Sequence, residues 1–288
     1  MIIDTHTHIF SPDMIAARAN LLSRDRWFGW LYANPRSAMA DVDALIASMD
    51  EAGVHCAVTF GFAWADEGLC RESNAYVLDA ARAYPWRLIP LAVVNPQAGR
   101  SALADAQRAL EDGFAGIGEL MPDGQGFALD DRVVLDDLMA LTRHYGVPVI
   151  THADELIGHD YPGKGTQGPH RTYRMALNYP DNRLILAHWG GGLPFYELMP
   201  EVREALRNVY YDTAASFYLY EPDVFRHVMA WAPEKVLLGT DFPLMSHRRF
   251  LRRLQKVDME QEMRRRLMGD NARVLFNLPD PDTGERGA

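Results

Sequence analysis

The chain has 288 residues, of which 48% are hydrophobic and 24% are charged, so it is long enough to bury one large core. Its formal net charge of −10 gives no long-range attraction to a polyanion, which argues against nucleic acid and against an anionic membrane surface as partners. The N-terminus lacks the cationic and apolar regions of a signal peptide, and no apolar run reaches the roughly 18 residues of a membrane helix.

Cysteine usage adds an expectation about the compartment. Cys56 and Cys70 form no CxxC pair, so we expect reduced thiols and a cytoplasmic location. The expected partner is a small-molecule substrate, and a homodimer stays open as an oligomeric state.

Short apolar runs rich in β-branched residues alternate with longer amphipathic stretches, which is typical of repeated strand–helix units around a parallel sheet. The expected strands lie at residues 2–8, 55–60, 88–95, 116–120, 148–152, 183–188, 209–213 and 236–241. The expected helices include residues 41–52, 72–84, 101–112, 130–145 and 222–231. This number and spacing of strands predict an α/β fold, the (β/α)8 TIM barrel, rather than an open doubly wound sheet. We expect one domain at 1–278 and a disordered tail at 279–288.

Two predicted connections, 11–40 and 153–169, are longer than a barrel needs. Both follow strands, so both are expected over the C-terminal face, where barrels of this kind place their sites. Aromatic residues near such a face are candidates for the wall of a substrate pocket, and we select Trp64 and Trp189 as candidate substrate contacts.

The first predicted strand carries a chelating pair, His6 and His8. Residues two apart on a strand point to the same side, so both imidazoles face the barrel axis. Neutral imidazoles are good ligands for Zn²⁺ and similar metals.

Other predicted strands end in the same kind of group. These residues are Glu119, His152, His188 and Asp241. A charged or imidazole side chain after an apolar run is costly to bury unless it is paired or ligating. Their repeated placement at strand ends therefore predicts a polar site at one level of the barrel.

Five motifs are spread along nearly the whole chain: DTHTHIF at 4–10, THADE at 151–155, AHWGGG at 187–192, LLGTDFP at 237–243 and GDNARVLFNL at 269–278. Through these motifs the chain resembles the amidohydrolase superfamily, in its amidohydrolase-2 branch, which groups hydrolases with decarboxylases similar to aminocarboxymuconate-semialdehyde decarboxylase. The resemblance implies a catalytic divalent metal, for which we expect Zn²⁺. It implies His6, His8, His152 and Asp241 as ligands, with His188 as acid/base or as a ligand to a second metal.

Glu119 departs from that pattern, because many binuclear relatives carry a carbamylated lysine on the fourth strand. It resembles relatives in which a glutamate there bridges two metals. The site is thus expected to hold one ion, with Glu119 as a ligand or orienting group, or two ions bridged by Glu119.

The expected function is metal-dependent hydrolysis of a small carbonyl compound such as a lactone, ester or amide. A bound metal would supply hydroxide, and Asp241 and His188 would act as the catalytic groups. The alternative is a lyase that decarboxylates an aromatic or unsaturated carboxylate without oxidation. Glu119 favours hydrolysis, since an added anion suits a neutral substrate better than a carboxylate. A non-catalytic metal-binding scaffold is the third reading.

Overall fold

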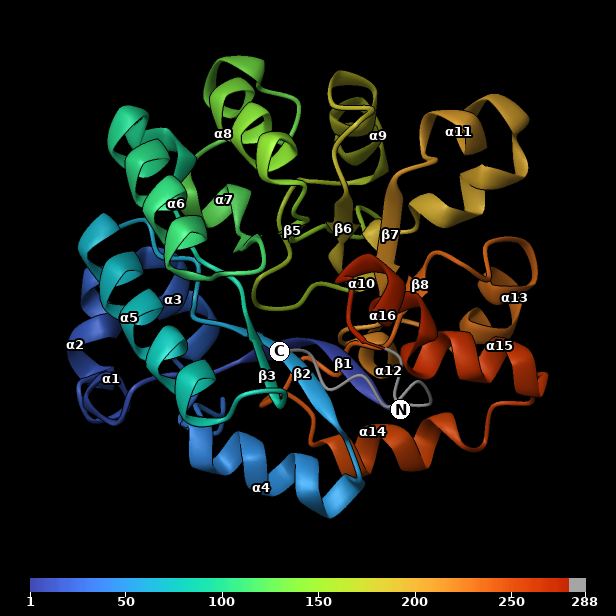
Figure 1. Cartoon of the computed structure of the whole chain (residues 1–288), viewed down its shortest axis with the longest axis horizontal. Helices are drawn as coiled ribbons and strands as arrows, with labels where there is room; N and C mark the ends of the chain where they lie inside the picture. The colour runs from blue at the N-terminus through green and yellow to red at the C-terminus, as the bar shows by residue number, and fades with distance from the viewer. Residues whose placement is uncertain (280–288) are drawn as a thin grey trace.

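A computed structural model of the chain describes residues 1–279. Eight strands form the inner wall of the fold (Figure 1). They are β1 (Ile3–His8), β2 (Cys56–Phe60), β3 (Leu88–Pro90), β4 (Ile117–Leu120), β5 (Val149–Thr151), β6 (Leu184–Leu186), β7 (Val209–Asp212) and β8 (Val236–Leu237). All of the paired strands run parallel, in the orders β1-β2-β3 and β4-β5-β6-β7-β8.

Two parallel bridges close these two sheets into a ring. Ala92 pairs with Ile117 at the junction of β3 and β4, and Thr7 pairs with Phe242 at the junction of β8 and β1. Backbone hydrogen bonds run along both junctions, including Gly118 N–H to Ala92 O and His8 N–H to Phe242 O. The predicted TIM barrel is therefore confirmed.

Helices surround the ring of strands (Figure 1). The longer ones are α4 (Val42–Ala52), α5 (Glu67–Ala83), α6 (Arg100–Asp112), α8 (Arg132–Tyr145), α9 (Pro169–Asn178), α13 (Asp223–Trp231) and α14 (His247–Leu254). The shorter ones are α1 (Pro12–Ala16), α2 (Arg18–Arg24), α3 (Arg26–Tyr32), α7 (Pro122–Gln125), α10 (Ala187–Gly190), α11 (Pro200–Ala205), α12 (Ser216–Leu219), α15 (Gln261–Arg265) and α16 (Asn271–Leu275), with η1 (Pro96–Ala98), η2 (Leu193–Leu198) and η3 (Arg266–Asp270). Because helices cover the outside of the sheet, strands such as β2, β5 and β6 are buried along their whole length.

Three strands end well before the sequence predicted: β3, which ends at Pro90 instead of residue 95, and two strands that lead to site residues. β6 ends at Leu186 and β8 at Leu237, although both were expected to continue to the site residues. The reason is local: His188 has φ 54° and Asp241 has φ 61°, and this left-handed region is incompatible with a strand. The site residues therefore stand on turns that leave the sheet.

The connection at 11–40 contains three short helices, α1 to α3, where the sequence predicted a loop. The side chain of Ser11 accepts a hydrogen bond from the Met14 N–H, and that of Asp25 accepts one from the Phe28 N–H. These caps satisfy N–H groups that a short helix leaves open at its start. The same effect begins α5 at Glu67 rather than at residue 72, because Asp66 caps it.

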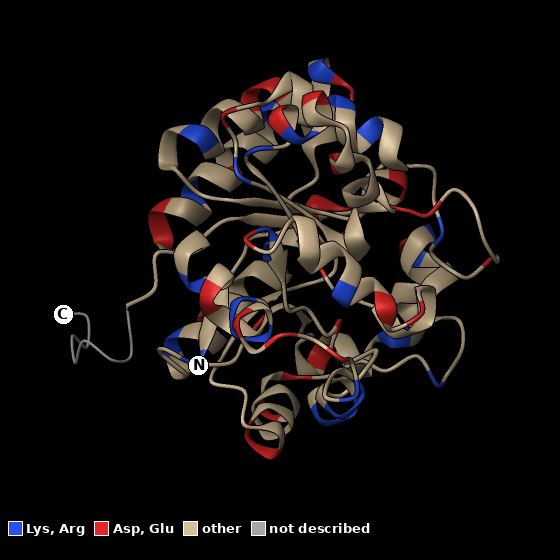
Figure 2. Cartoon of the chain, turned by 90° about the vertical axis from the view of Figure 1, so that its right-hand side faces the viewer, with Lys and Arg blue, Asp and Glu red and all other residues tan. Residues whose placement is uncertain are grey.

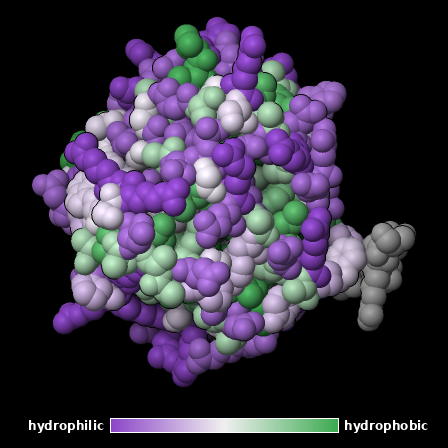
Figure 3. Space-filling view, turned by 90° about the vertical axis from the view of Figure 1, so that its left-hand side faces the viewer, coloured by the Kyte–Doolittle hydropathy of each residue, from purple (hydrophilic) through white to green (hydrophobic). Residues whose placement is uncertain are grey.

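The outside of the barrel is mixed in character. Basic and acidic residues are interspersed over the helices (Figure 2), and on another side hydrophobic residues lie scattered among hydrophilic ones (Figure 3). None of the helices described within residues 1–279 is both long and apolar enough to span a bilayer. The predicted tail at 279–288 lies, apart from Pro279, outside the described residues.

Candidate metal centre

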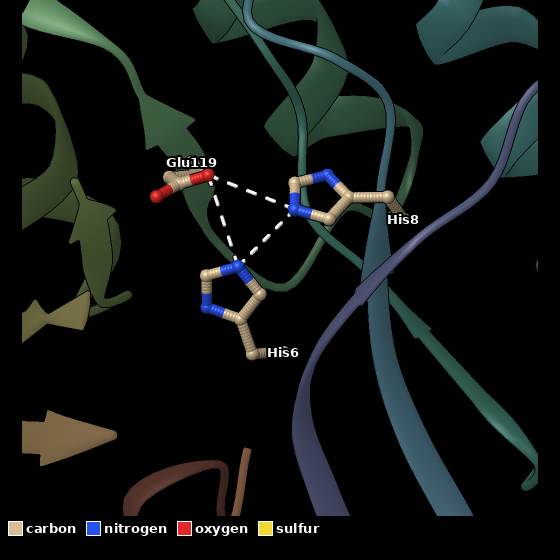
Figure 4. Close-up of side chains that lie close together, drawn as sticks. All are labelled: His6, His8 and Glu119. Carbon is tan, nitrogen blue, oxygen red and sulfur yellow. Dashed lines mark hydrogen bonds and ion pairs between the residues drawn. The ribbon is translucent and has the colours of Figure 1, made fainter. Parts of the chain in front are cut away.

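The barrel brings all six of the predicted polar residues together. His6 and His8 lie on β1 and Glu119 lies on β4, while His152, His188 and Asp241 follow the ends of β5, β6 and β8. The six converge because the strands are parallel and their carboxyl ends share one face of the barrel. Figure 4 shows His6, His8 and Glu119 pointing toward one another.

Four donor atoms form a first set, composed of His6 Nε2, His8 Nε2, Glu119 Oε2 and Asp241 Oδ1. The two histidine nitrogens are 3.2 Å apart. The Glu119 oxygen lies 3.8 Å from the His6 nitrogen and 3.7 Å from that of His8. The Asp241 oxygen lies 3.7 Å and 3.6 Å from the same two nitrogens. A tetrahedral ion with bonds of about 2.05 Å separates its ligands by about 3.3 Å, so this set has the size of a coordination shell.

A second donor set shares Glu119. Its other oxygen, Oε1, lies 3.2 Å from His152 Nδ1 and 3.8 Å from His188 Nε2. The two histidine nitrogens are 3.1 Å apart. His152 thus groups with His188 across Glu119, rather than with the pair on β1 as the resemblance implied. Glu119 offers one carboxylate oxygen to each set.

Every histidine of the site has an oxygen acceptor behind it. His6 Nδ1 lies 2.8 Å from Asp212 Oδ2, and His152 Nε2 lies 3.1 Å from Asp154 Oδ1. The other two histidines meet backbone carbonyls: His8 Nδ1 is 3.3 Å from Gly61 O, and His188 Nδ1 is 3.1 Å from Ala214 O.

An acceptor behind the ring places the N–H on the outward nitrogen, because a neutral imidazole has only one. The inward nitrogens then present lone pairs to one another at 3.1–3.2 Å. Such facing lone pairs repel unless a proton or a metal cation lies between them. The donor set therefore fits a divalent metal ion.

The electrostatics of the site point the same way. Burial lowers the pKa of His6, but Asp212, Glu119 and Asp241 outweigh it and raise this pKa to about 10. Burial also opposes charge on His152, yet Asp154 and Glu119 hold its pKa well above the ordinary value.

The pKa values of His8 and Glu119 are shifted as well. Burial lowers the pKa of His8, and His6 lowers it further. Burial raises the pKa of Glu119, but the surrounding histidines outweigh that effect and hold it far below its usual range. The buried carboxylates thus demand positive charge, which a divalent ion supplies without protonating its ligands.

Sequence reasoning missed Asp212 and Asp154, the carboxylates behind His6 and His152. Both are fully buried, and Asp212 also accepts hydrogen bonds from the His188 and Ala214 N–H groups. A signal was present for Asp212, because it is the second-last residue of the predicted strand 209–213 and so lies near a strand end like the residues that were selected. Carboxylates behind metal-binding histidines orient the rings and commonly affect metal affinity.

Trp64 and Trp189, the candidate substrate contacts, lie in the interior. Both side chains are 0% exposed. The Trp64 indole N–H donates to Ser73 Oγ at 2.8 Å, and the Trp189 indole N–H donates to Ser216 Oγ at 2.7 Å. Each ring therefore has a structural partner in the interior, and contact of either ring with a substrate stays a prediction.

The aromatic rings nearest the donors are different ones. Phe60 meets His6 and His8 edge-on, with ring centroids 5.1 Å and 4.7 Å apart. On α3, Tyr32 stacks on Phe28 with centroids 4.4 Å apart. Burial raises the pKa of the Tyr32 phenol, and the charge of Asp241 raises it further, which places this phenol within the electrostatic reach of the site.

Comparison with known proteins gives a family and several decarboxylases. A family model described as Amidohydrolase (Amidohydro_2) matches residues 3–278. The 6-methylsalicylic acid decarboxylase of Penicillium expansum is 32% identical over 137 residues, which covers 38% of this chain and 41% of that protein. The match thus spans well under half of the relative's length.

Solved structures share the fold over nearly the whole chain. The 5-carboxyvanillate decarboxylase of Novosphingobium aromaticivorans, complexed with manganese and 4-hydroxy-3-methoxy-5-nitrobenzoic acid, has a TM-score of 0.78 and 19% identity, covering 96% of each chain. The 2,6-dihydroxybenzoate decarboxylase from Rhizobium has a TM-score of 0.71 and 18% identity, covering 96% of this chain and 98% of that one.

These similarities overturn the expectation of a hydrolase, because the three similar proteins named above are decarboxylases and match the alternative. The expectation rested on the charge of Glu119, which was taken to repel a carboxylate substrate. In the structure that charge faces four histidines, with Glu119 oxygens 3.2–3.8 Å from their inward nitrogens. The charge therefore faces a cation site, where a bound divalent ion would compensate it, so it does not exclude an anionic substrate.

Proposed function

Because the chain belongs to the amidohydrolase family, matching its model over residues 3–278, we propose that it is a metal-dependent, non-oxidative decarboxylase of a small hydroxybenzoate. The observation that carries the proposal is the ring of inward-facing donors on His6, His8, Glu119 and Asp241. The substrate class is supported by the names of the similar proteins, each of which acts on a benzoic acid that bears a hydroxyl group.

The first donor set would hold a divalent ion, for which Zn²⁺ remains our expectation, although one similar structure contains manganese. The second set, Glu119 with His152 and His188, is where a second ion would bind. When bound, the metal supplies positive charge that neutralises and orients the carboxylate and the neighbouring hydroxyl oxygen of the substrate. The histidines hold this charge in place through their outward hydrogen bonds, so little reorganisation accompanies binding.

Asp241 is the group we assign to proton transfer. Its side chain is 15% exposed, compared with 3% for Glu119, so it is the carboxylate nearer the mouth. Its Oδ1 faces the two histidines of β1, which leaves Oδ2 to exchange a proton with solvent or substrate. His188 is less suited to this role, because its inward nitrogen lies within the second donor set.

The reaction consumes one proton and releases carbon dioxide. Asp241 delivers a proton to the ring carbon that carries the carboxylate. The bond from that carbon to the carboxylate then breaks, its electron pair restores the aromatic ring, and CO2 leaves. Phe60 packs edge-on against the β1 histidines, and Tyr32, which is partly exposed on α3, would supply apolar surface for the flat face of an aromatic substrate.

The test is an assay of the purified protein, loaded with Zn²⁺ or with Mn²⁺, against hydroxybenzoates and against lactones. We expect CO2 release and loss of the carboxylate from at least one hydroxybenzoate, and no hydrolysis of the lactones. Asp241→Asn should lower the rate per bound metal about 10²–10⁴-fold. A metal-loaded protein that releases no CO2 from the hydroxybenzoates, or that opens a lactone, contradicts the proposal.

A further inference from the structure

A buried carboxylate, that of Asp4, joins the two segments that carry His6 and Asp241. Asp4 lies on β1 and is 0% exposed. Its Oδ1 accepts hydrogen bonds from the backbone N–H of His6 at 3.0 Å and of Thr240 at 3.1 Å. Its Oδ2 accepts a hydrogen bond from the Thr240 hydroxyl. One side chain therefore ties the residue before Asp241 to the backbone of His6.

The tie adds to a short junction. β8 is two residues long, and β1 meets the segment after it through the bridge Thr7–Phe242 and a few backbone hydrogen bonds, including Asp241 N–H to His6 O at 3.0 Å. Asp241 has φ 61°, a left-handed conformation that a residue other than glycine holds only where its surroundings fix it. The two hydrogen bonds from Thr240 to Asp4 fix the residue just before Asp241 through its N–H and its hydroxyl.

A buried histidine supports Asp4 from the helical layer. His247, the first residue of α14, is 0% exposed. Its Nε2 lies 3.1 Å from Asp4 Oδ2, although the contact lacks the alignment of a hydrogen bond, so we treat it as electrostatic. Its Nδ1 lies 2.8 Å from the hydroxyl of Ser48 on α4, and its ring stacks on Phe242 with centroids 5.3 Å apart. Helices α4 and α14 pack together, and His247 connects them to the junction between β8 and β1 (Figure 1).

We propose that Asp4 and His247 are positioning residues for the metal centre. Through Thr240 they hold Asp241 Oδ1 at 3.6–3.7 Å from the inward nitrogens of the β1 histidines. Neither residue is itself a ligand in this proposal. It rests on the metal-binding part of the proposed function and is independent of the reaction.

Asp4→Asn is the main test, because it keeps the size of the side chain but replaces one acceptor oxygen with an N–H2 group that faces donors. We expect the dissociation constant for Mn²⁺, measured by competition with a chelator, to rise about 10–100-fold. The electron paramagnetic resonance spectrum of the bound Mn²⁺ should also change, since the ligand geometry is altered.

Asp25→Asn is the matched control. Asp25 is also buried, 3% exposed, and clamps two backbone N–H groups, those of Phe28 and Ala65. It touches neither β1 nor β8 through these bonds. We expect this variant to lower the melting temperature while leaving the Mn²⁺ affinity unchanged.

Two substitutions at His247 keep the proposal testable if Asp4→Asn fails to fold. His247→Phe retains a ring against Phe242 but removes both nitrogens, and should weaken Mn²⁺ binding. His247→Gln retains an N–H group that can reach Asp4, and should restore most of the affinity.

Unchanged Mn²⁺ affinity and spectrum in Asp4→Asn and His247→Phe, with only the melting temperature lowered, would overturn the inference and leave the metal site intact. A wild-type protein that binds neither Mn²⁺ nor Zn²⁺ would instead refute the metal part of the proposed function, and this inference with it.

Discussion

Glu119 connects the two donor sets of the site, because each of its carboxylate oxygens faces a different pair of histidines. Oε2 lies within 3.8 Å of the two β1 nitrogens, and Oε1 lies 3.2 Å from His152 Nδ1. The side chain is 3% exposed, so solvent does not replace these contacts. Removing its charge therefore affects both donor sets at once.

Glu119→Gln should weaken metal binding by at least about 10–100-fold, since it keeps the shape of the side chain but deletes one negative charge next to the ion. If the wild type binds two ions, the metal content of the variant should be lower by more than one ion per chain, measured at a metal concentration that just saturates the wild type. Chelator competition and elemental analysis measure the two effects.

Glu197→Gln is the control for this variant. Glu197 is a buried glutamate elsewhere in the barrel, 1% exposed and paired with Lys235 at 2.6 Å. Its loss should lower stability and spare metal affinity. Equal affinity for Glu119→Gln and the wild type would remove Glu119 from the ligand set.

At the scale of elements, the turn after β6 is shaped by glycines that bring two loops into contact. Gly191 has φ 65°, and a Cβ there would lie 2.2 Å from the backbone oxygen of Asp154. Asp154 in turn orients His152 through a 3.1 Å contact. The glycine therefore permits the close approach that sets one histidine of the site.

Gly191→Ala should destabilise the fold more than Gly53→Ala, although both glycines are left-handed. At Gly53, with φ 68°, an added Cβ meets nothing within 4 Å, so only the penalty of about 1–2 kcal/mol for a left-handed backbone applies. At Gly191 a clash with backbone adds about 1–3 kcal/mol. Urea denaturation of both variants gives the comparison, and equal losses would contradict the close approach.

At the scale of the molecule, the metal would join strands from both sheets of the barrel. The donors come from β1 in one sheet, and from β4 and the segments after β5, β6 and β8 in the other. An ion that binds only the folded chain stabilises it by mass action, by about 2.7 kcal/mol when its concentration is 100 times the dissociation constant.

The two cysteines report on this stabilisation. Cys56 and Cys70 are 5% and 3% exposed, and burial raises the pKa of each from 9.0 to about 12, so at pH 8 both thiols stay protonated and enclosed. We expect a thiol reagent to label them slowly in the metal-loaded protein, and up to about 100-fold faster after chelation where labelling requires unfolding. Denatured protein provides the upper limit, and identical native rates with and without metal would contradict a stabilising ion.

Much of the fold follows from local sequence. Apolar runs rich in β-branched residues predicted all eight strands, because a strand buried on both faces needs such a run regardless of its neighbours. Helix starts were less predictable: α5 begins at Glu67 because Asp66 caps it, a short-range hydrogen bond that apolar periodicity does not reveal. The helices α1 to α3 were missed for the same reason.

The sequence by itself determined which polar residues would meet, because the alternation of strands and helices makes the strands parallel and places their carboxyl ends on one face. His6, His8, Glu119, His152, His188 and Asp241 needed no further information to be selected. Only the tertiary structure decided how these residues divide into two donor sets, because the division depends on which atoms face inward. His152 pairs with His188 across Glu119, apart from the histidines of β1.

The side chains that support the ligands could not be predicted from the sequence either. Asp212 is 206 residues from His6, and Thr240 is 236 residues from Asp4, so no local pattern connects them. The error about the reaction has the same origin. The charge of Glu119 is visible in the sequence, whereas the surrounding histidines, which would hold a compensating cation beside it, come together only once the barrel is closed.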